Sequence, residues 1–378
     1  MLIKNASCVM ASNVLERDIR IEGGKICDIA TEITPKANEE IYDATGMKLF
    51  AGFIDTHTHG AVGHFYSNFG VDFQAICEFE AREGVTTIAV THTSMQIDDF
   101  ESVCKEVLPL INNTRGAKIG GFHSEGPFMN LNKKGAMNPK RIISPSVEIF
   151  DRMYEATQGQ MKLMTLAPEN DGALDVIKRA VSKGVQITAG HTEATYEQMQ
   201  RAIDAGVTRM THTFNACRAL NHREPGVLGA ALTDDRIVCE VICDFGHLHP
   251  AIVELIYKLK GSSHFCAISD SEFAAGLAEG VYESEGISRY IDTKMGVCRL
   301  EDGTICGSAS SLYRGFKNLV SMGIPLWEVS EMVSANPAKA LGIYDKTGSI
   351  SVGKAADLVF VNDKYEIVRV LVDGKDAK

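Results

Sequence analysis

The sequence lacks several patterns that would assign it to a common class of protein. It contains no Gly-x-Gly-x-x-Gly segment, so a dinucleotide-binding fold has no local support. It has no apolar run long enough to span a bilayer, and its first residues do not join a basic segment to an apolar one as a signal peptide does. No Cys-x-x-Cys pair occurs among the ten cysteines, most of which lie within apolar runs. We therefore expect reduced thiols, no membrane partner and a cytoplasmic location.

An excess of positive charge is absent as well. The 378 residues carry a net charge of −11, which argues against binding to nucleic acid or to a membrane surface. A local cluster could still hold an anionic substrate. Hydrophobic residues make up 45% and charged residues 23%, as in ordinary globular proteins, and the chain is long enough to bury a large core.

The stretch 49–60 stands at the centre of the sequence pattern. An apolar run typical of a buried strand ends at Asp55, His57 and His59. Residues i and i+2 of an extended chain point to the same side, so the two imidazoles would converge at the end of this strand. Imidazole is a common ligand of zinc and iron. Two loop histidines without a metal would be the simpler interpretation if no other strand ended in such residues.

Strand-like and helix-like segments alternate through the middle of the chain. Eight segments have the composition of buried strands: residues 50–55, 85–91, 118–122, 162–167, 185–189, 209–213, 237–243 and 265–269. Amphipathic segments such as 72–83, 172–183 and 195–205 lie between most of them. This alternation predicts an α/β fold, a (β/α)8 TIM barrel, with an open doubly wound sheet as the alternative.

Short strand-like segments at both ends predict a small β-sandwich domain beside the barrel. They are residues 1–9, 18–22 and 25–30 near the N-terminus and 348–352, 357–362 and 367–373 near the C-terminus. Neither set is large enough to fold alone, so we expect the two ends to pair. The predicted domains are 1–50 with 346–378 for the β-domain and 51–345 for the barrel.

The predicted strand ends carry an unusual number of metal-type side chains. They are His57, His59, His92, His123, Glu125, His191, His212, Asp244, His247 and Asp270. A single histidine at a strand end is more often a hydrogen-bonded structural residue. TIM barrels place their catalytic residues at the carboxyl ends of the strands. Most of the eleven histidines would therefore lie on one rim of the barrel, and this clustering predicts a metal site.

These motifs carry a resemblance to a known family. The metal-dependent amidohydrolase superfamily combines a barrel with a small β-domain built from both termini. It has His-x-His after strand one, histidines after strands five and six, and an aspartate after strand eight. Within it, the chain resembles the N-acetylglucosamine-6-phosphate deacetylase family along nearly its full length. The matching segments are 52–60, 125–128, 133–136, 190–192, 194–196, 211–216, 223–226, 307–309 and 336–338.

The resemblance implies one or two divalent metals per subunit. Glu125, His191 and His212 would bind the principal metal. His57 and His59 would bind a second one, with Glu125 bridging the two. Zinc is expected first, although such ligands also accept iron, cobalt or manganese.

The resemblance also implies two catalytic residues. Asp270 would take a proton from the attacking water and deliver it to the leaving amine. His247 would hydrogen-bond the carbonyl oxygen of the substrate. A role for Asp270 as a metal ligand only is the alternative, and the two roles are compatible.

For the substrate, the resemblance implies that Asn215, Ala216 and Arg223 hold a sugar phosphate. Arg223 would come from the neighbouring subunit of a homodimer, and an ion pair of Arg223 with Glu224 is the structural alternative. Met137 is a further candidate contact. It stands where the family usually has a histidine that contacts the sugar, and a thioether cannot replace an imidazole donor.

The predicted activity is removal of the acetyl group from an N-acetylated amino-sugar phosphate. N-acetyl-D-glucosamine 6-phosphate, giving D-glucosamine 6-phosphate and acetate, is the first candidate. Met137 and Phe245 depart from the family, so N-acetylgalactosamine 6-phosphate or another N-acyl sugar is an alternative. A ring-opening amidohydrolase is disfavoured because no lysine follows strand four. A non-catalytic sugar-phosphate binding protein would have no need of Asp270 as a proton shuttle.

Overall fold

Eight parallel strands form the central sheet of the molecule, which the computed structural model describes over residues 1–111, 113–284 and 286–377. Their order in the sheet is β15-β14-β13-β12-β11-β10-β9-β6. The strands are β6 (Phe53–Thr58), β9 (Val85–His92), β10 (Lys118–Glu125), β11 (Met161–Leu166), β12 (Gln186–Ala189), β13 (Val207–Met210), β14 (Val238–Ile242) and β15 (Phe265–Ile268). The predicted TIM barrel is confirmed, and each strand overlaps a predicted one.

The chain segments that follow the first and last strands join them and close the barrel. The backbone N–H of Asp270 donates to His57 O at 2.9 Å, and that of His59 donates to Ser271 O at 2.7 Å. Three predicted metal-site residues therefore lie in the seam of the barrel, where the backbone holds them at fixed relative positions.

Helices cover the outside of the barrel. They are α1 (Phe73–Arg82), α2 (Ile97–Val107), α3 (Val147–Ala156), α4 (Ala173–Ser182), α5 (Tyr196–Ala205), α6 (Gly226–Thr233), α7 (Pro250–Lys260), α8 (Leu312–Ser321), α9 (Leu326–Ser330) and α10 (Asn336–Ala340). Because side chains fill the barrel and helices surround it, every residue of β9 is buried. Local signals set the helix ends: Thr195 and Gln198 form a capping box on α5. Gly84 follows α1 with a φ of +83°, a conformation that favours glycine.

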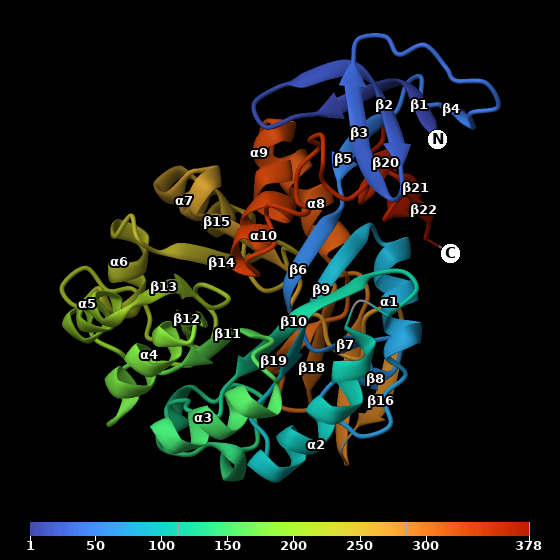
Figure 1. Cartoon of the computed structure of the whole chain (residues 1–378). Coiled ribbons are helices and arrows are strands. Elements are labelled where there is room, and N and C mark those ends of the chain that lie inside the picture. The colour runs from blue at the N-terminus through green and yellow to red at the C-terminus, as the bar shows by residue number, and fades with distance from the viewer. Residues whose placement is uncertain (112, 285, 378) are drawn as a thin grey trace.

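Strands from both chain ends form a second sheet, as predicted. Figure 1 shows the blue N-terminal strands beside the red C-terminal ones. The strands are β1 (Leu2–Val9), β2 (Val14–Glu22), β3 (Lys25–Ala30), β4 (Ile41–Asp43), β5 (Lys48–Ala51), β20 (Leu358–Val361), β21 (Ile367–Val372) and β22 (Lys375–Asp376). The central pairing is antiparallel between β20 and β5 and buries Leu49 against Leu358 and Phe360 in a separate core. The domain boundaries at 50–51 and 345–346 stay a prediction.

Two predicted strands differ in the structure. The segment 50–55 is not one strand: β5 ends at Ala51 in the terminal sheet, and β6 begins at Phe53 in the barrel. Between them Gly52 donates its N–H to Asp357 O at 2.8 Å, so the chain passes from one sheet to the other at this glycine. The segment 348–352 forms turns instead of a strand, while its Ile350 is buried in the terminal core.

A four-stranded antiparallel sheet follows β15, and the sequence analysis did not predict it. It consists of β16 (Gly280–Ser284), β17 (Ile287–Asp292), β18 (Val297–Leu300) and β19 (Ile305–Ser308). A small hairpin, β7 (Gly60–Ala61) with β8 (His64–Phe65), follows β6. In the described part of the chain, no helix combines the length and the apolar character needed to cross a membrane.

Candidate metal centre and active site

The predicted metal ligands and the predicted catalytic Asp270 all lie at the carboxyl ends of barrel strands. The ligands are His57 in β6, His59 just after it, Glu125 at the end of β10, His191 after β12 and His212 after β13, and Asp270 follows β15. Their side chains converge in two groups that share one carboxylate. The structure therefore brings together residues that are up to 213 positions apart in the sequence (57 to 270).

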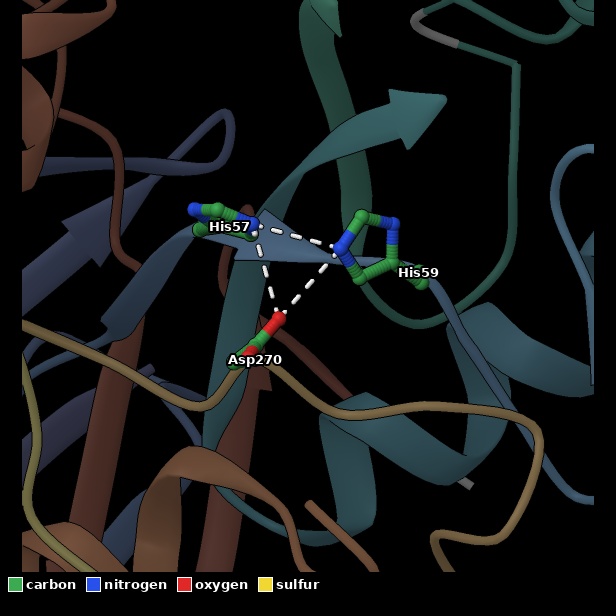
Figure 2. Close-up of side chains that lie close together, drawn as sticks. All are labelled: His57, His59 and Asp270. Carbon is green, nitrogen blue, oxygen red and sulfur yellow. Dashed lines mark hydrogen bonds and ion pairs between the residues drawn. The ribbon is translucent and has the colours of Figure 1, made fainter. Parts of the chain in front are cut away.

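The first group contains His57, His59 and Asp270. Figure 2 shows the two imidazoles and the carboxylate pointing toward one another. The Nε2 atoms of the two histidines are 3.2 Å apart. Asp270 Oδ1 lies 3.5 Å from His57 Nε2 and 3.3 Å from His59 Nε2. These separations are close to the distance between neighbouring nitrogen or oxygen ligands of a single tetrahedral ion, about 3.3–3.5 Å.

The second group contains Glu125, His191 and His212. Glu125 Oε1 lies 3.2 Å from His191 Nε2 and 3.0 Å from His212 Nε2, and these two nitrogens are 3.1 Å apart. Glu125 also lies 3.3 Å from the Nε2 atoms of both His57 and His59. Its two oxygens therefore stand between the two groups, as a carboxylate that bridges two ions would.

The orientation of the histidines indicates that a cation belongs at the centre. His191 Nδ1 is 2.7 Å from Lys133 O, and His59 Nδ1 is 3.1 Å from Thr91 O. A carbonyl oxygen only accepts, so each Nδ1 carries a proton, and in the neutral ring Nε2 presents a lone pair. The two Nε2 atoms face oxygens of Glu125, which are acceptors too. A proton on each Nε2 or a divalent ion between them removes this repulsion, so the donor set fits a metal.

The electrostatics of the site agree with this interpretation. Burial disfavours a charged His59, but its hydrogen bonds to Asp270 and Glu125 outweigh burial and raise its pKa to about 9. Burial likewise opposes ionisation of Glu125, yet the charges of His57 and His191 hold its pKa well below its ordinary value. The pKa of Asp270 is lowered to about 2 by His59 and His57 despite burial. The two carboxylates thus stabilise positive charge between them, whether protons or a metal supply it.

Several of these residues have unusual backbone conformations. His191, His212 and Asp270 have φ values of 49°, 26° and 51°, and so do Ala216 at 45° and Phe245 at 64°. Each such conformation costs roughly 1–3 kcal/mol in a residue other than glycine. Strain of this kind collects where a fold holds side chains for a function.

A buried ion pair between Glu240 and Arg209 contacts His57 at Nδ1, the ring nitrogen that does not face Glu125. His57 Nδ1 is 3.4 Å from Glu240 Oε2, and Glu240 Oε1 accepts a hydrogen bond from Arg209 Nε at 3.0 Å. Burial opposes ionisation of Glu240, but its bonds to His57 and Arg209 lower its pKa to about 2. This pair was not predicted from the sequence. The available signal was Glu240 inside an otherwise apolar strand segment, with Arg209 in the preceding strand.

Two strand-end histidines do not join the metal groups. His92 is fully buried next to Phe100, and neither of its ring nitrogens has a hydrogen-bond partner among the described residues. Burial lowers its pKa to about 3. His123 lies between Thr56 O and Thr165 Oγ1, at 2.9 Å from each. Both lie in the last residues of their strands, as expected, but they pack in different places: His92 contacts Phe100 of α2, whereas His123 points to the same side of β10 as Glu125 and packs against the ring of His57.

His247 is held by an aspartate three residues before it. Its Nδ1 donates to Asp244 Oδ2 at 2.7 Å, and Asp244 Oδ1 accepts from the backbone N–H groups of Gly246 and His247 at 2.8 and 2.9 Å. Burial opposes protonation of His247, but Asp244 outweighs it and raises the pKa of the ring. Asp244 was predicted only as a strand-end residue, and its spacing from His247 was the signal for this role.

A cavity of about 610 Å³ opens above the metal groups. The predicted substrate contacts Met137, Asn215, Ala216 and His247 all line it. Met137 is 8% exposed, and its Sδ accepts from Ser94 Oγ at 3.3 Å.

Arg223 does not belong to the described lining of the cavity of its own chain. It lies exposed in the loop before α6. The alternative of an ion pair between Arg223 and Glu224 is not found among the described residues, where Glu224 lies 3.6 Å from Arg218.

The opposite wall of the cavity comes from the unpredicted sheet. Arg289 of β17 and Cys306 of β19 line it together with Glu272, which follows β15. Nothing in the sequence pattern linked these residues to the histidines, because their approach depends on how this sheet folds back on the rim.

The end of strand four holds no lysine, as the sequence indicated. β11 ends at Leu166, and Glu169 beyond it accepts hydrogen bonds from Thr192 Oγ1 at 2.5 Å and from Glu193 N at 2.6 Å. This carboxylate orders the loop after His191. Glu125 of β10 occupies the bridging position between the two groups.

Comparisons with known proteins agree with this arrangement. The model of the amidohydrolase family matches residues 49–376. The N-acetylglucosamine-6-phosphate deacetylase of Bacillus subtilis is 34% identical and aligns over 100% of this chain and 97% of its own. An N-acetylgalactosamine-6-phosphate deacetylase of Escherichia coli is 30% identical over 87% of each chain. The solved structure of a mutant N-acetyl-D-glucosamine-6-phosphate deacetylase from Mycobacterium smegmatis, in complex with N-acetyl-D-glucosamine 6-phosphate, has a TM-score of 0.92 and 30% identity and covers 100% of this chain and 99% of its own.

Proposed function

The chain belongs to the amidohydrolase family, among the N-acetylglucosamine-6-phosphate deacetylases, and on this premise we propose that it removes the acetyl group from N-acetyl-D-glucosamine 6-phosphate. The products are D-glucosamine 6-phosphate and acetate. The observation that carries the proposal is the pair of histidine–carboxylate groups joined by Glu125, with Asp270 in one of them, at the floor of a cavity.

The residues of the two groups would hold one or two divalent ions. Nitrogen and oxygen donors at these separations suit zinc best, and also suit iron, cobalt and manganese. Such an ion would polarise the amide carbonyl and make the attacking water more acidic.

Asp270 would move the proton. Its Oδ1 faces His57 and His59, which leaves Oδ2 to accept a proton from water and to pass it to the leaving nitrogen. Its lowered pKa keeps the carboxylate ionised, as the resting form of a proton acceptor must be.

His247 would stabilise the negative charge that develops on the carbonyl oxygen. Because its Nδ1 proton goes to Asp244, its Nε2 donates only when the ring is protonated. The raised pKa of His247 favours this imidazolium, whose charged hydrogen bond is stronger than a neutral one.

The phosphate would bind at Asn215 and Ala216, which line the cavity and offer backbone and amide groups. We infer that Arg223 of a second subunit completes the site in a homodimer. The exposure of Arg223 and its absence from the described lining of its own cavity support this role. The ten free cysteines fit a reducing, cytoplasmic location.

The identity of the sugar depends on the wall around Met137. A thioether accepts only weakly and cannot donate, so this position cannot hold a sugar hydroxyl as a histidine would. An N-acetylgalactosamine 6-phosphate deacetylase is therefore the second candidate, and a relative of that name supports it.

Acetate release from a panel of substrates tests the proposal. Metal-loaded protein is incubated with N-acetylglucosamine 6-phosphate, with its galactosamine counterpart and with unphosphorylated N-acetylglucosamine. We expect the first to give the highest kcat/KM and the unphosphorylated sugar the lowest. Asp270→Asn serves as the control for contaminating hydrolases. If metal-loaded protein binds these sugar phosphates but releases no acetate, the protein is a binding protein and the proposal is wrong.

A further inference from the structure

A third cluster of metal-type side chains lies on the cavity wall, apart from the two histidine groups. Glu272 follows β15, Cys298 lies in β18 and Cys306 lies in β19. One carboxylate oxygen and the two sulfur atoms all lie within 4.8 Å of one another. Cys298 and Glu272 are buried, and Cys306 is half-buried at the cavity surface.

The backbone holds these three side chains in place. β19 pairs with the segment after β15: Glu272 N donates to Ser308 O at 3.0 Å, and Ser308 N donates to Asp270 O at 2.8 Å. Within the sheet, Cys298 stands opposite Gly307, next to Cys306. The donor atoms are therefore brought together by fixed strands, so little ordering is needed before they bind an ion.

One separation in the cluster matches that around a tetrahedral ion. Cys306 Sγ donates to Glu272 Oε2 at 3.6 Å. An ion with a metal–sulfur bond of about 2.3 Å and a metal–oxygen bond of about 2.1 Å places sulfur and oxygen about 3.6 Å apart at the tetrahedral angle. The two side chains could therefore exchange this hydrogen bond for coordination of one ion without moving apart.

The charges of the side chains in and around the cluster would sum to zero with a divalent ion bound. Arg289 forms an ion pair with Glu272 through Oε1, and its guanidinium lies over the rings of Phe65 and Phe273. Its Nε has no hydrogen-bond partner among the described residues. Two thiolates and one carboxylate carry three negative charges, and a divalent ion with Arg289 supplies three positive ones. Arg289 thus acts as the outer partner that a ligating carboxylate usually has.

We propose that Glu272, Cys298 and Cys306 form a third metal site, which takes a thiophilic divalent cation of the zinc type. Glu272 and Cys306 line the cavity, so the ion enters from there and its fourth position faces water. Binding exchanges the two thiol protons for the ion. It also ties β18 and β19 to the segment that carries Asp270.

The thiols fit this role better than a role as nucleophiles. The hydrogen bond with Cys298 and burial both raise the pKa of Cys306. A thiol that stays protonated is a poor nucleophile, whereas a bound metal deprotonates its ligating thiols. The site does not depend on the proposed deacetylase activity, since it shares no ligand with the histidine groups.

Cobalt substitution distinguishes this site from the other two. Metal-free protein is titrated with Co²⁺, which gives a thiolate-to-cobalt charge-transfer absorption only where sulfur binds the ion. We expect this band in the wild type and in His191→Ala, which loses a ligand of the principal site. We expect it to be absent in Cys298→Ser and in Cys306→Ser. Cys27→Ser, at an exposed cysteine of β3, is the matched control and should keep it.

Mass-spectrometric mapping of alkylated cysteines is a second test, and it requires only the wild-type protein. Zn²⁺ should protect Cys306, the ligand at the cavity surface, from alkylation, and Cys27 should stay reactive. The proposal is wrong if saturating Co²⁺ gives no thiolate band, or if the band persists without both cysteines. It is also wrong if Cys306 resists alkylation without metal until a reductant is added, because it then forms a disulfide.

Discussion

The pairing of His247 with Asp244 leads to a prediction about the pH dependence of the reaction. In Asp244→Asn, the oxygen that accepts from Gly246 N and His247 N at 2.8 and 2.9 Å keeps its place. The amide nitrogen then takes the position of Oδ2, 2.7 Å from His247 Nδ1. An amide N–H donates, so Nδ1 must become the acceptor and the neutral ring carries its proton on Nε2.

This change of tautomer alters the pH profile as well as the rate. In the wild type, the competent form is the imidazolium, so kcat is present below the raised pKa of His247 and is lost as the pH rises through it. In Asp244→Asn, the neutral ring already donates from Nε2, so this alkaline loss should disappear. A hydrogen bond from a neutral donor contributes about 0.5–1.5 kcal/mol, whereas one from a charged donor contributes about 1.5–3 kcal/mol. The difference of roughly 1–1.5 kcal/mol predicts that maximal kcat falls by about tenfold.

The assay is kcat for acetate release, measured across the neutral and alkaline range with saturating substrate and metal. Ser308→Ala is the matched control, because Ser308 Oγ also contacts Asp244 Oδ2, at 3.4 Å, but does not set the tautomer of His247. It should keep the wild-type alkaline limb. An Asp244→Asn enzyme with an unchanged alkaline limb would refute the assignment of His247 as a charged donor.

Three further predictions concern the other site residues. Asp270→Asn should lower kcat by at least ~10²-fold, since general acid–base groups contribute about 10²–10⁴, and an unchanged kcat with metal bound would assign the base elsewhere. His191→Ala should lose most of the principal metal in elemental analysis while His222→Ala, at an exposed loop histidine, keeps it, and full activity in metal-free protein would contradict the metal centre. Arg223→Ala should raise KM for the phosphorylated sugar by at least ~10-fold, as expected for a lost charged hydrogen bond, with little change for the unphosphorylated one. Mixed dimers of Arg223→Ala and Asp270→Asn should regain part of the activity if Arg223 acts in trans, and exchanged dimers without recovery would place it in its own site.

Local patterns in the sequence were sufficient for the barrel and for the side chains at its strand ends, among which the candidate metal ligands lie. Strand and helix periodicity depends on neighbouring residues, so the eight barrel strands could be located before any contact was known. Because parallel strands of a barrel end on one rim, residues such as His57, His191 and Asp270 could be assigned to one site from their positions after these strands. The resemblance to a family then distinguished Glu125, at the end of β10, as the bridging carboxylate.

Other features depend on contacts between distant parts of the chain, which no local pattern encodes. Only the closed barrel shows that His92 packs against α2 and that His123 is held by Thr56 and Thr165, while His57 faces Glu125 and Asp270, because these contacts join strands and helices far apart in the sequence. The apolar run 50–55 is divided at Gly52 because its first residues pair in the terminal sheet and its last residues pair in the barrel. The cluster of Glu272, Cys298 and Cys306 forms only when the sheet β16–β19 folds back on the rim. The sequence therefore determined which residues end the barrel strands, and the tertiary structure decided which side chains meet, since hydrogen bonding across the seam and burial act between residues far apart in the chain.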